Sequence, residues 1–376
     1  MKGHVARRWK QFVVAGAMTA LVAGMGSTLP SAYAGGTIKA DDDKWISIGM
    51  GIRTSFNSIE NGAANGQAYS NEFTINNARI YINGQVHKYV KFEFNTDCFN
   101  CNVVGTSSIN SGTGFFGGNS TIGLLDAIGK FEFNEMVNIW VGRMLLPSER
   151  GELNGPFYHA TFDGFRTPLF PADFSGNFNA GGGGGAGLYG RDNAATFWGK
   201  IHPFGTHLLY VASVSQGLRN GPNTGNSLMY TGRLQWNLLN DEPSPGYYTA
   251  GTYYGTAGDI LAIAGNVQHQ KDGAGNLTGS NVSDFTGLSV DLLFEKVLPN
   301  NMGVFTFNGE FKRFFANYGT GAFTNNPGAC FCVFNGHSWT AYGLYLIPNE
   351  VGIGRFQPYV RFTSVSPLYS AMRQEF

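Results

Sequence analysis

The stretch WISIGMGIRTSFN, residues 45–57, decides the expected fold because its side chains alternate strictly in character. In a β-strand, Met50 and Ile52 would share one face, while Gly51 and Arg53 would share the other. A transmembrane strand of about 9–11 residues is apolar toward lipid and polar toward a lumen. A strand of a soluble β-sandwich also alternates, so the period alone does not separate these two folds.

The same alternation recurs from residue 44 onward, in segments separated by clusters of Gly, Asn, Pro and Asp. Phe92 and Phe94, for example, alternate with Lys91 and Glu93. We expect about 13 strands, at 45–57, 73–86, 90–97, 123–133, 136–146, 195–202, 207–216, 228–239, 259–270, 284–296, 303–314, 338–347 and 356–365. No long segment after residue 35 has the 3.6-residue period of a helix.

Composition narrows the class of protein. Charged residues make up 13% of the 376 residues, about half the usual share, and aromatic residues make up 14%. Few charges argue against a soluble enzyme, the lack of long apolar runs in the mature chain argues against a helical membrane protein, and many aromatics argue against disorder. We therefore predict an all-β fold, a transmembrane antiparallel up-and-down β-barrel, with the strand length and the aromatic content favouring it over the sandwich.

The first 34 residues have the layout of a secretory signal peptide. Basic residues between Lys2 and Lys10 precede an apolar run, and Ala32 and Ala34 form a small-x-small cleavage site. A transmembrane anchor and a twin-arginine signal at Arg7-Arg8 are the alternatives. Removing residues 1–34 leaves 21 basic against 25 acidic residues, which argues against nucleic-acid binding. We expect cleavage near Ala34 and a porin β-barrel over 35–376 in the bacterial outer membrane.

Short and long connections alternate along the chain, as expected for periplasmic turns and external loops. The short ones are 87–89, 134–135, 203–205, 298–302 and 348–355, and the long ones are 98–122, 147–194, 216–227, 271–283 and 315–337. The stretch 240–258 is an exception on the short side. Loop 147–194 is the longest, and we expect it to fold inward and narrow the lumen. A loose external loop is the alternative, favoured by the glycine run 181–185.

Several motifs resemble known porins. The run from Glu72 to Val86, with Arg79 and Gly84, looks like the second strand of the phosphate-selective porin O/P family. The segments 90–94 and 141–149 resemble the parts that follow in that family. The segments 142–158, 189–199 and 242–255 are similar to the porin part of fused outer-membrane cytochrome–porins. These families continue for about three more strands, so the resemblance implies a C-terminally truncated barrel of about 16 strands when complete.

The chain departs from both families in its chemistry. It contains no CxxCH motif, because Asn102 follows Cys98-Phe-Asn-Cys101, so it cannot itself hold the haem of a cytochrome. It also lacks the surplus of Arg and Lys that phosphate capture would need. We expect disulfides at Cys98, Cys101, Cys330 and Cys332, with a zinc site or free thiols as alternatives. No cofactor or metal is expected.

Charged residues within the strands are expected to face the lumen, because a charge at the lipid midplane costs a few kcal/mol. Arg79 and Arg143 are the strongest candidates for a constriction. For any single residue, a plain solvated lumen position is the alternative. The predicted lumen or constriction residues are Arg53, Arg79, Lys91, Glu93, Lys130, Glu132, Arg143, Arg233, Glu310, Lys312 and Arg361.

Two functions follow from these features. The first is an outer-membrane porin for passive diffusion of small hydrophilic solutes or anions, embedded in lipid, with a homotrimer as its expected assembly. The alternative is a barrel sleeve around a periplasmic multihaem cytochrome, which would form an electron-transfer conduit. No Ser/His/Asp or paired-carboxylate arrangement stands out, so we do not expect an enzyme.

Overall fold

The structure is a computed structural model, and it describes residues 35–99, 121–154, 190–217, 222–276, 281–317, 330–331, 335–352 and 354–368. Strands dominate these residues. The strands are β1 (Gly35–Lys39), β2 (Trp45–Ile59), β3 (Ser70–His87), β4 (Val90–Phe99), β5 (Thr121–Glu132), β6 (Asn138–Leu145), β7 (Arg191–Ile201), β8 (His207–Ser215), β9 (Met229–Asn237), β10 (Ile260–Asn276), β11 (Ser283–Val297), β12 (Val304–Ala316), β13 (Cys330–Phe331), β14 (Gly336–Leu346), β15 (Glu350–Val351), β16 (Gly354–Arg355) and β17 (Tyr359–Pro367). The helical elements are α1 (Arg150–Leu153) and the 3₁₀ turn η1 (Pro203–Gly205).

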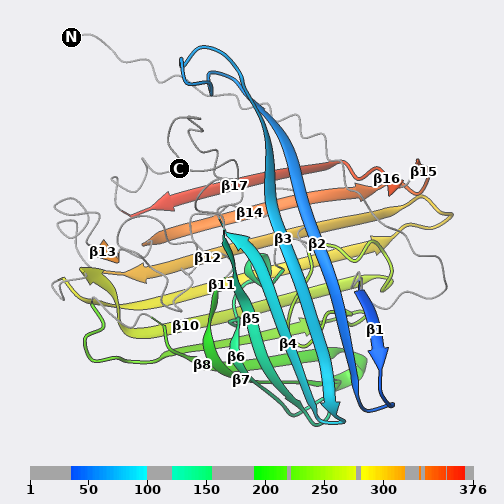
Figure 1. Cartoon of the computed structure of the whole chain (residues 1–376), viewed down its shortest axis with the longest axis vertical. Helices are drawn as coiled ribbons and strands as arrows, with labels where there is room; N and C mark the ends of the chain where they lie inside the picture. Colours follow the sequence, from blue (N-terminus) through cyan, green and yellow to red (C-terminus); the bar gives the residue numbers. More distant parts are fainter. Residues whose placement is uncertain are drawn as a thin grey trace. The chain divides into compact units, whose positions relative to one another are not determined.

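The strands pair in sequence order. The sheet runs from β1 through β12 and continues with β14 and β17, while β13 pairs with β10 and β15 pairs with β16. Each pairing from β5 to β12, and on to β14 and β17, is antiparallel. Figure 1 shows β7 to β12 side by side in this order. The predicted all-β, up-and-down antiparallel class is confirmed, whereas the total of about 16 strands stays a prediction.

All the predicted strand segments correspond to observed strands, with ends that differ by a few residues. The short strand β1 was not predicted, because its sequence GGTIK is too short to show an alternation. Helix α1 was missed for a similar reason: four residues cannot display a 3.6-residue period. None of the described helices is long and apolar enough to cross a membrane.

The chain divides into two compact units. The smaller unit includes residues 48–81 and 96–99, where a polar cluster joins neighbouring strands. In this cluster Arg53 Nη1 donates to Asn77 Oδ1 at 3.2 Å, and Asn77 Nδ2 donates to Asp97 Oδ2 at 3.0 Å. Arg79 Nε donates to the same carboxylate oxygen at 2.7 Å. The alternation of β2 and β3 therefore gathers polar side chains on one face.

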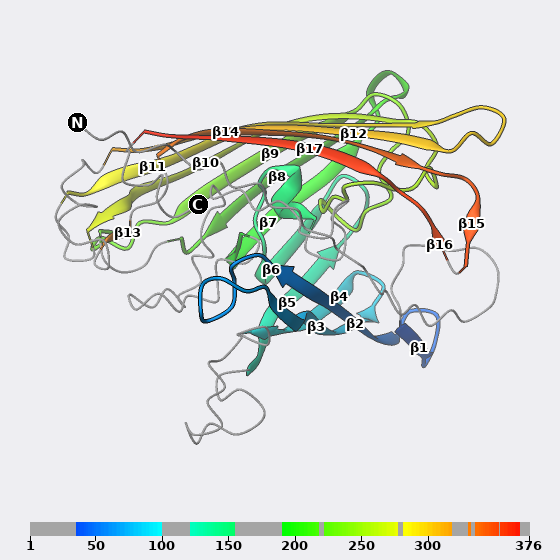
Figure 2. The same ribbon diagram turned by 90° about the horizontal axis from the view of Figure 1, so that it is seen from above.

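The larger unit contains residues 36–47, 82–95 and the described part of 125–376, and its strands are polar on their buried face. On β12, Phe311 is 45% exposed whereas Lys312 is 1% exposed. On β9, Leu234 is 53% exposed whereas Arg233 is 3% exposed. Figure 2 gives a second view of these strands. This distribution is the reverse of a soluble sandwich, in which apolar side chains pack between the sheets.

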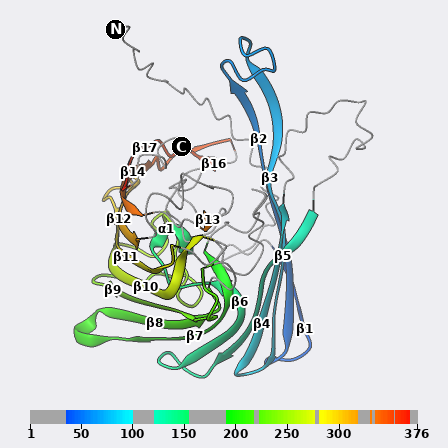
Figure 3. The same cartoon turned by 90° about the vertical axis from the view of Figure 1, so that its left-hand side faces the viewer.

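Two connections of the larger unit place buried residues against the polar strand faces, one of them along its described length and the other in part. The inward fold expected for loop 147–194 is confirmed for residues 147–154, all of which are buried, while 155–189 lie outside the described residues. Figure 3 shows α1 on the inner side of the curved strands β9 to β12. Segment 241–258 lies within the stretch 240–258, the expected exception among the short connections, and also supplies buried side chains, including Glu242, Tyr247 and Tyr253. These two connections fill space that a plain lumen would leave to water.

Candidate functional site: a buried polar network

The site begins with a row of polar residues across neighbouring strands. The antiparallel register places Arg233 of β9 opposite Asn266 of β10, Asn266 opposite Ser289 of β11, and Ser289 opposite Lys312 of β12. Two residue pairs along, Asp291 lies opposite Glu310. Because each strand alternates, all of these side chains point to the same face of the sheet.

The backbone of residues 147–151 is hydrogen-bonded by that strand face. The carboxylate of Asp291 accepts from Arg150 N at 3.1 Å, and that of Glu310 accepts from Gly151 N at 2.9 Å. Arg233 Nη1 donates to Ser148 O at 2.8 Å. The first N–H groups of a helix have no partner within the helix, and a carboxylate is a favourable acceptor for them. Strand side chains therefore hold α1 in place.

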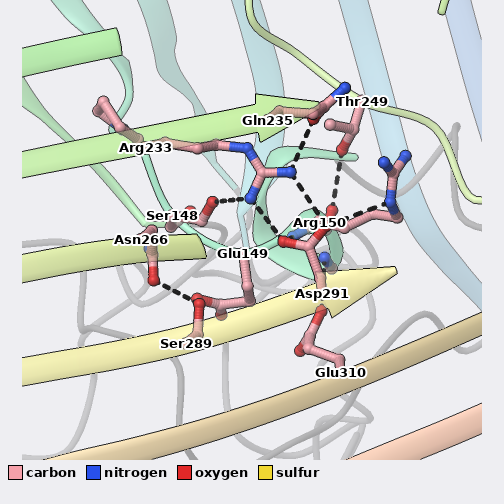
Figure 4. A network of polar contacts seen from close by, with 12 residues as sticks. Ser148, Glu149, Arg150, Arg233, Gln235, Thr249, Asn266, Ser289, Asp291 and Glu310 are labelled. Atoms are coloured by element: carbon pink, nitrogen blue, oxygen red, sulfur yellow. Dashed lines mark hydrogen bonds and ion pairs between the residues drawn. The ribbon is translucent and has the colours of Figure 1, made fainter. Parts of the chain in front are cut away.

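Buried ion pairs link α1 to the strands (Figure 4). Arg233 reaches Asp291 through two contacts of 2.5 and 3.0 Å. Lys312 pairs with Glu149 and with Glu310 at 3.1 Å, and its Nζ lies 3.9 Å from Glu152 Oε1. Such pairs give little net stability, but removing one partner leaves a buried charge and costs about 3–5 kcal/mol. The pairs therefore fix the position of α1.

Segment 241–258 is joined to α1 by a second set of contacts. Arg150 donates from Nη1 and Nη2 to the two carboxylate oxygens of Glu242 at 2.7 and 2.6 Å. Tyr253 Oη donates to the same carboxylate at 2.6 Å. Thr249 Oγ1 lies within hydrogen-bond distance of two oxygens, Arg150 O at 3.0 Å and Asn154 Oδ1 at 2.6 Å. A bidentate Arg–carboxylate pair is geometrically specific, so Glu242 and Arg150 form a latch between the two connections.

An aromatic cluster borders this network. The ring centroid of Trp140 lies 5.6 Å from that of Trp198, 5.2 Å from that of Tyr247 and 5.5 Å from that of Tyr248. Lys130 Nζ lies 4.0 Å from the Trp140 ring centroid, a cation–π geometry. Tyr247 Oη donates to Leu145 O at 2.5 Å, which ties segment 241–258 to the end of β6.

Burial shifts the titration of groups in these connections. It raises the pKa of Glu152 to about 8, although the nearby Lys312 ammonium opposes that rise. It also raises the pKa of Tyr253 well above its usual value, and the Glu242 carboxylate adds to that effect. A carboxyl group with a pKa near 8 is largely protonated at neutral pH and can then donate a hydrogen bond.

The predicted lumen residues lie on the buried or half-buried face of their strands. Glu93 pairs with Lys130, and Lys91 pairs with Glu132 at 2.6 Å. Arg143 Nε donates to Leu125 O at 3.0 Å. Arg233, Glu310 and Lys312 enter the α1 network described above, and Arg361 is half-buried on β17. The constriction role expected for Arg79 and Arg143 stays a prediction.

Sequence reasoning missed the residues that the connections contribute. Glu149, Arg150, Glu152 and Glu242 are all buried, yet they lie outside the predicted strands. The available signal was the run of alternating charges at 149–152 in a chain that is otherwise poor in charge.

The cysteine pairing stays a prediction. Cys98 is disulfide-bonded. Cys101 and Cys332 lie outside the described residues, and Cys330 begins the short strand β13. Residues 1–34, the predicted signal peptide, also lie outside the described residues.

No protein-family model matches the chain, and no curated protein matches it. The chain is similar to the trimer form of OmpT, an outer membrane protein of Vibrio cholerae, at 8% identity and a TM-score of 0.37, over 87% of this chain and 91% of that one. It is similar to OmpF of Salmonella typhi in complex with daunomycin at 10% identity and a TM-score of 0.37, over 88% and 100%. It is also similar to outer-membrane expressed OmpT of Vibrio cholerae, at 9% identity and a TM-score of 0.31, over 87% of this chain and 100% of that one. Likeness of this degree leaves the family open, so the two porin resemblances stay hypotheses.

Proposed function

We propose that the chain is an outer-membrane channel protein, not an enzyme, through which small hydrophilic solutes diffuse passively. The observation that carries this proposal is the reversed distribution of side chains: charged residues are buried and large apolar residues are exposed on the same strands. Charged side chains on the outer face would be costly in lipid, whereas apolar ones are favourable there. Strands of 9 to 17 residues in β7 to β12 are long enough to span a bilayer.

The charge of the interior favours cations over anions. The buried acidic residues of the described chain are Glu93, Asp97, Asp126, Glu149, Glu152, Asp192, Glu242, Asp291, Glu295 and Glu310, and the buried basic residues are Arg79, Lys130, Arg150, Arg191, Arg233 and Lys312. Because Glu152 is largely protonated at neutral pH, nine charged acids against six bases give these buried residues a net negative charge. We therefore favour cations and neutral solutes over the anions that the sequence also allowed.

The two buried connections support restricted passage. Residues 147–154 and 241–258 lie against the polar strand faces and are latched to each other by Arg150 and Glu242. A solute has to pass around them or displace them. We propose that they set the size limit of the channel and that their movement sets how often it is open.

Planar-bilayer recording tests this function. Purified protein, inserted into a bilayer that separates two KCl concentrations, should give stepwise currents with a reversal potential that indicates K⁺ preference. Insertion without any ion current would contradict a channel, and a Cl⁻-selective reversal potential would contradict the proposed role of the acidic surplus.

A further inference from the structure

Two histidines face each other across the turn between β7 and β8. His202 follows β7 and His207 begins β8, with η1 between them. Their Nδ1 atoms are 2.8 Å apart, their ring centroids are 4.9 Å apart, and the ring planes meet at 83°. The second ring nitrogen of His202, Nε2, lies 3.2 Å from Glu135 Oε2. The buried polar network and the proposed diffusion of solutes use none of these three side chains.

Hydrogen bonds hold the backbone of the turn that carries His202 and His207. Lys200 N donates to Glu135 O at 2.7 Å, which keeps the Glu135 turn beside the end of β7. Thr206 N donates to Pro203 O at 2.9 Å, and the Thr206 hydroxyl accepts from Trp236 Nε1 at 2.7 Å. The His202 side chain is nevertheless 41% exposed. The pair therefore combines a fixed backbone with rings that solutes can reach.

We propose that His202 and His207 bind a divalent transition-metal ion through their Nδ1 atoms, with Cu²⁺ preferred. Metal–nitrogen bonds are about 2.0 Å long, so two ligands at a right angle place their nitrogens about 2.8 Å apart, whereas tetrahedral ligands place them about 3.3 Å apart. The observed 2.8 Å between the Nδ1 atoms matches the right-angle arrangement. Tetragonal sites of this kind with nitrogen and oxygen ligands are typical of Cu²⁺ and Ni²⁺.

Glu135 orients His202, the first of the two proposed metal ligands. A histidine that binds a metal usually donates its other ring N–H to a carboxylate, which fixes the tautomer and makes the free nitrogen more basic. The 3.2 Å contact between His202 Nε2 and Glu135 places a carboxylate where it serves this purpose. With the proton on Nε2, Nδ1 of His202 has its lone pair free for the ion. In the metal-free pair the Nδ1 of His207 donates to that of His202. The ion displaces this hydrogen bond: His207 shifts to the tautomer with its proton on Nε2, and small rotations of both rings bring the two lone pairs to one point.

Water completes the coordination. Among the described residues, no group of three or more His, Cys, Asp or Glu side chains could hold a metal ion. The site is therefore a two-nitrogen site with open positions, and exchange of the ion with solution is fast compared with a closed structural site.

The test uses the full mature chain, without an affinity tag, titrated with CuCl₂ in detergent. We expect one saturable Cu²⁺ site whose electron paramagnetic resonance spectrum shows two equivalent nitrogens, with affinity falling from Cu²⁺ to Ni²⁺. His202→Asn and His207→Asn should each abolish that spectrum, whereas His87→Asn, at the exposed end of β3, should leave it unchanged. Glu135→Gln should weaken Cu²⁺ binding by about 10-fold or more while keeping both nitrogens.

Two results would overturn the proposal. One is the absence of saturable Cu²⁺ binding by the natural protein, which would leave the pair as a hydrogen bond alone. The other is a spectrum of the natural protein with fewer than two imidazole nitrogens, which needs no variant and so does not depend on variant folding. Neither result bears on ion conduction, so the proposed channel function stands or falls separately.

Discussion

Replacing Glu242 by Gln should release segment 241–258 from α1 and open the interior to ions. Glu242 is 4% exposed and accepts hydrogen bonds from three side chains. Arg150 supplies two of these bonds at 2.7 and 2.6 Å, Gln235 supplies one at 2.8 Å, and Tyr253 supplies one at 2.6 Å. The substitution keeps the size of the side chain but removes its charge, so Arg150 loses the bidentate partner while remaining buried.

The size of the effect follows from that unpaired charge. Removing one partner of a buried pair costs about 3–5 kcal/mol, and about 1.4 kcal/mol corresponds to a tenfold change in an equilibrium. Arg150 Nε still lies 3.5 Å from Asp291, so the lower end of the range applies. The equilibrium between docked and released segments should therefore shift by roughly 10²-fold toward release.

Single-channel recording in planar bilayers measures this shift as a higher open probability or a larger conductance. The double variant Arg150→Met with Glu242→Met should return toward the natural behaviour, because neither charge is then buried alone. Lys296→Gln is the matched control: it breaks the exposed pair with Asp259, which is worth at most about 1 kcal/mol. If the Glu242→Gln protein inserts normally and its currents are unchanged, the latch argument is wrong.

Three further predictions concern the lipid face, the pH dependence and the packing of the buried connections. Leu234→Arg should block insertion, since a charge on the lipid face costs about 2–4 kcal/mol, whereas Leu234→Phe should insert; equal yields in outer-membrane fractions would contradict this face. Burial raises the pKa of Glu152 to about 8 from an ordinary value of 4.5, so its contribution to docking is complete below pH 4.5 and is lost as pH rises through 8. Open probability should therefore increase as pH rises from 4.5 to about 8 and level off above that, and Glu152→Gln should flatten this part of the profile. Gly246 has φ +61°, and a Cβ at this position would collide with the Trp140 ring. Gly246→Ala should therefore lower the free energy of unfolding by about 1–3 kcal/mol, measured by urea unfolding followed by Trp fluorescence. Gly225→Ala is the control, because a Cβ at Gly225 would meet open space.

The strands could be predicted from the sequence because alternation is a local property. Each side chain of β9, for example, points opposite to its neighbour, so the pattern of Arg233 and Leu234 is visible without any tertiary information. The alternation alone does not say which face of the sheet is buried. The prediction that the polar face is buried rests on composition, strand length and the signal peptide, and the exposures of Leu234 and Arg233 agree with this prediction.

The partners of the strand charges could not be predicted, because they come from connections far away in the chain. Lys312 was a predicted lumen residue, but its contacts with Glu149 and Glu152 join positions about half the chain apart. A buried charge needs a partner, since an unpaired one is very costly. That rule predicts that partners exist for the strand charges but does not say which residues they are.

The stretch 240–258, the exception to the alternation of short and long connections, indicates where partners of the strand charges lie. A periplasmic-side turn needs only a few residues, yet 240–258 is long and has four tyrosines in a stretch with few charges. Glu295, a buried strand carboxylate, accepts hydrogen bonds from Tyr253 N at 3.0 Å and Gly255 N at 2.8 Å, both from this stretch. An acid on a lumen-facing strand position needs donors, and a long neighbouring connection has backbone N–H groups that need acceptors. The two needs are complementary, so a long connection on the short side of an up-and-down sheet is better interpreted as a segment that folds inward than as an irregular turn.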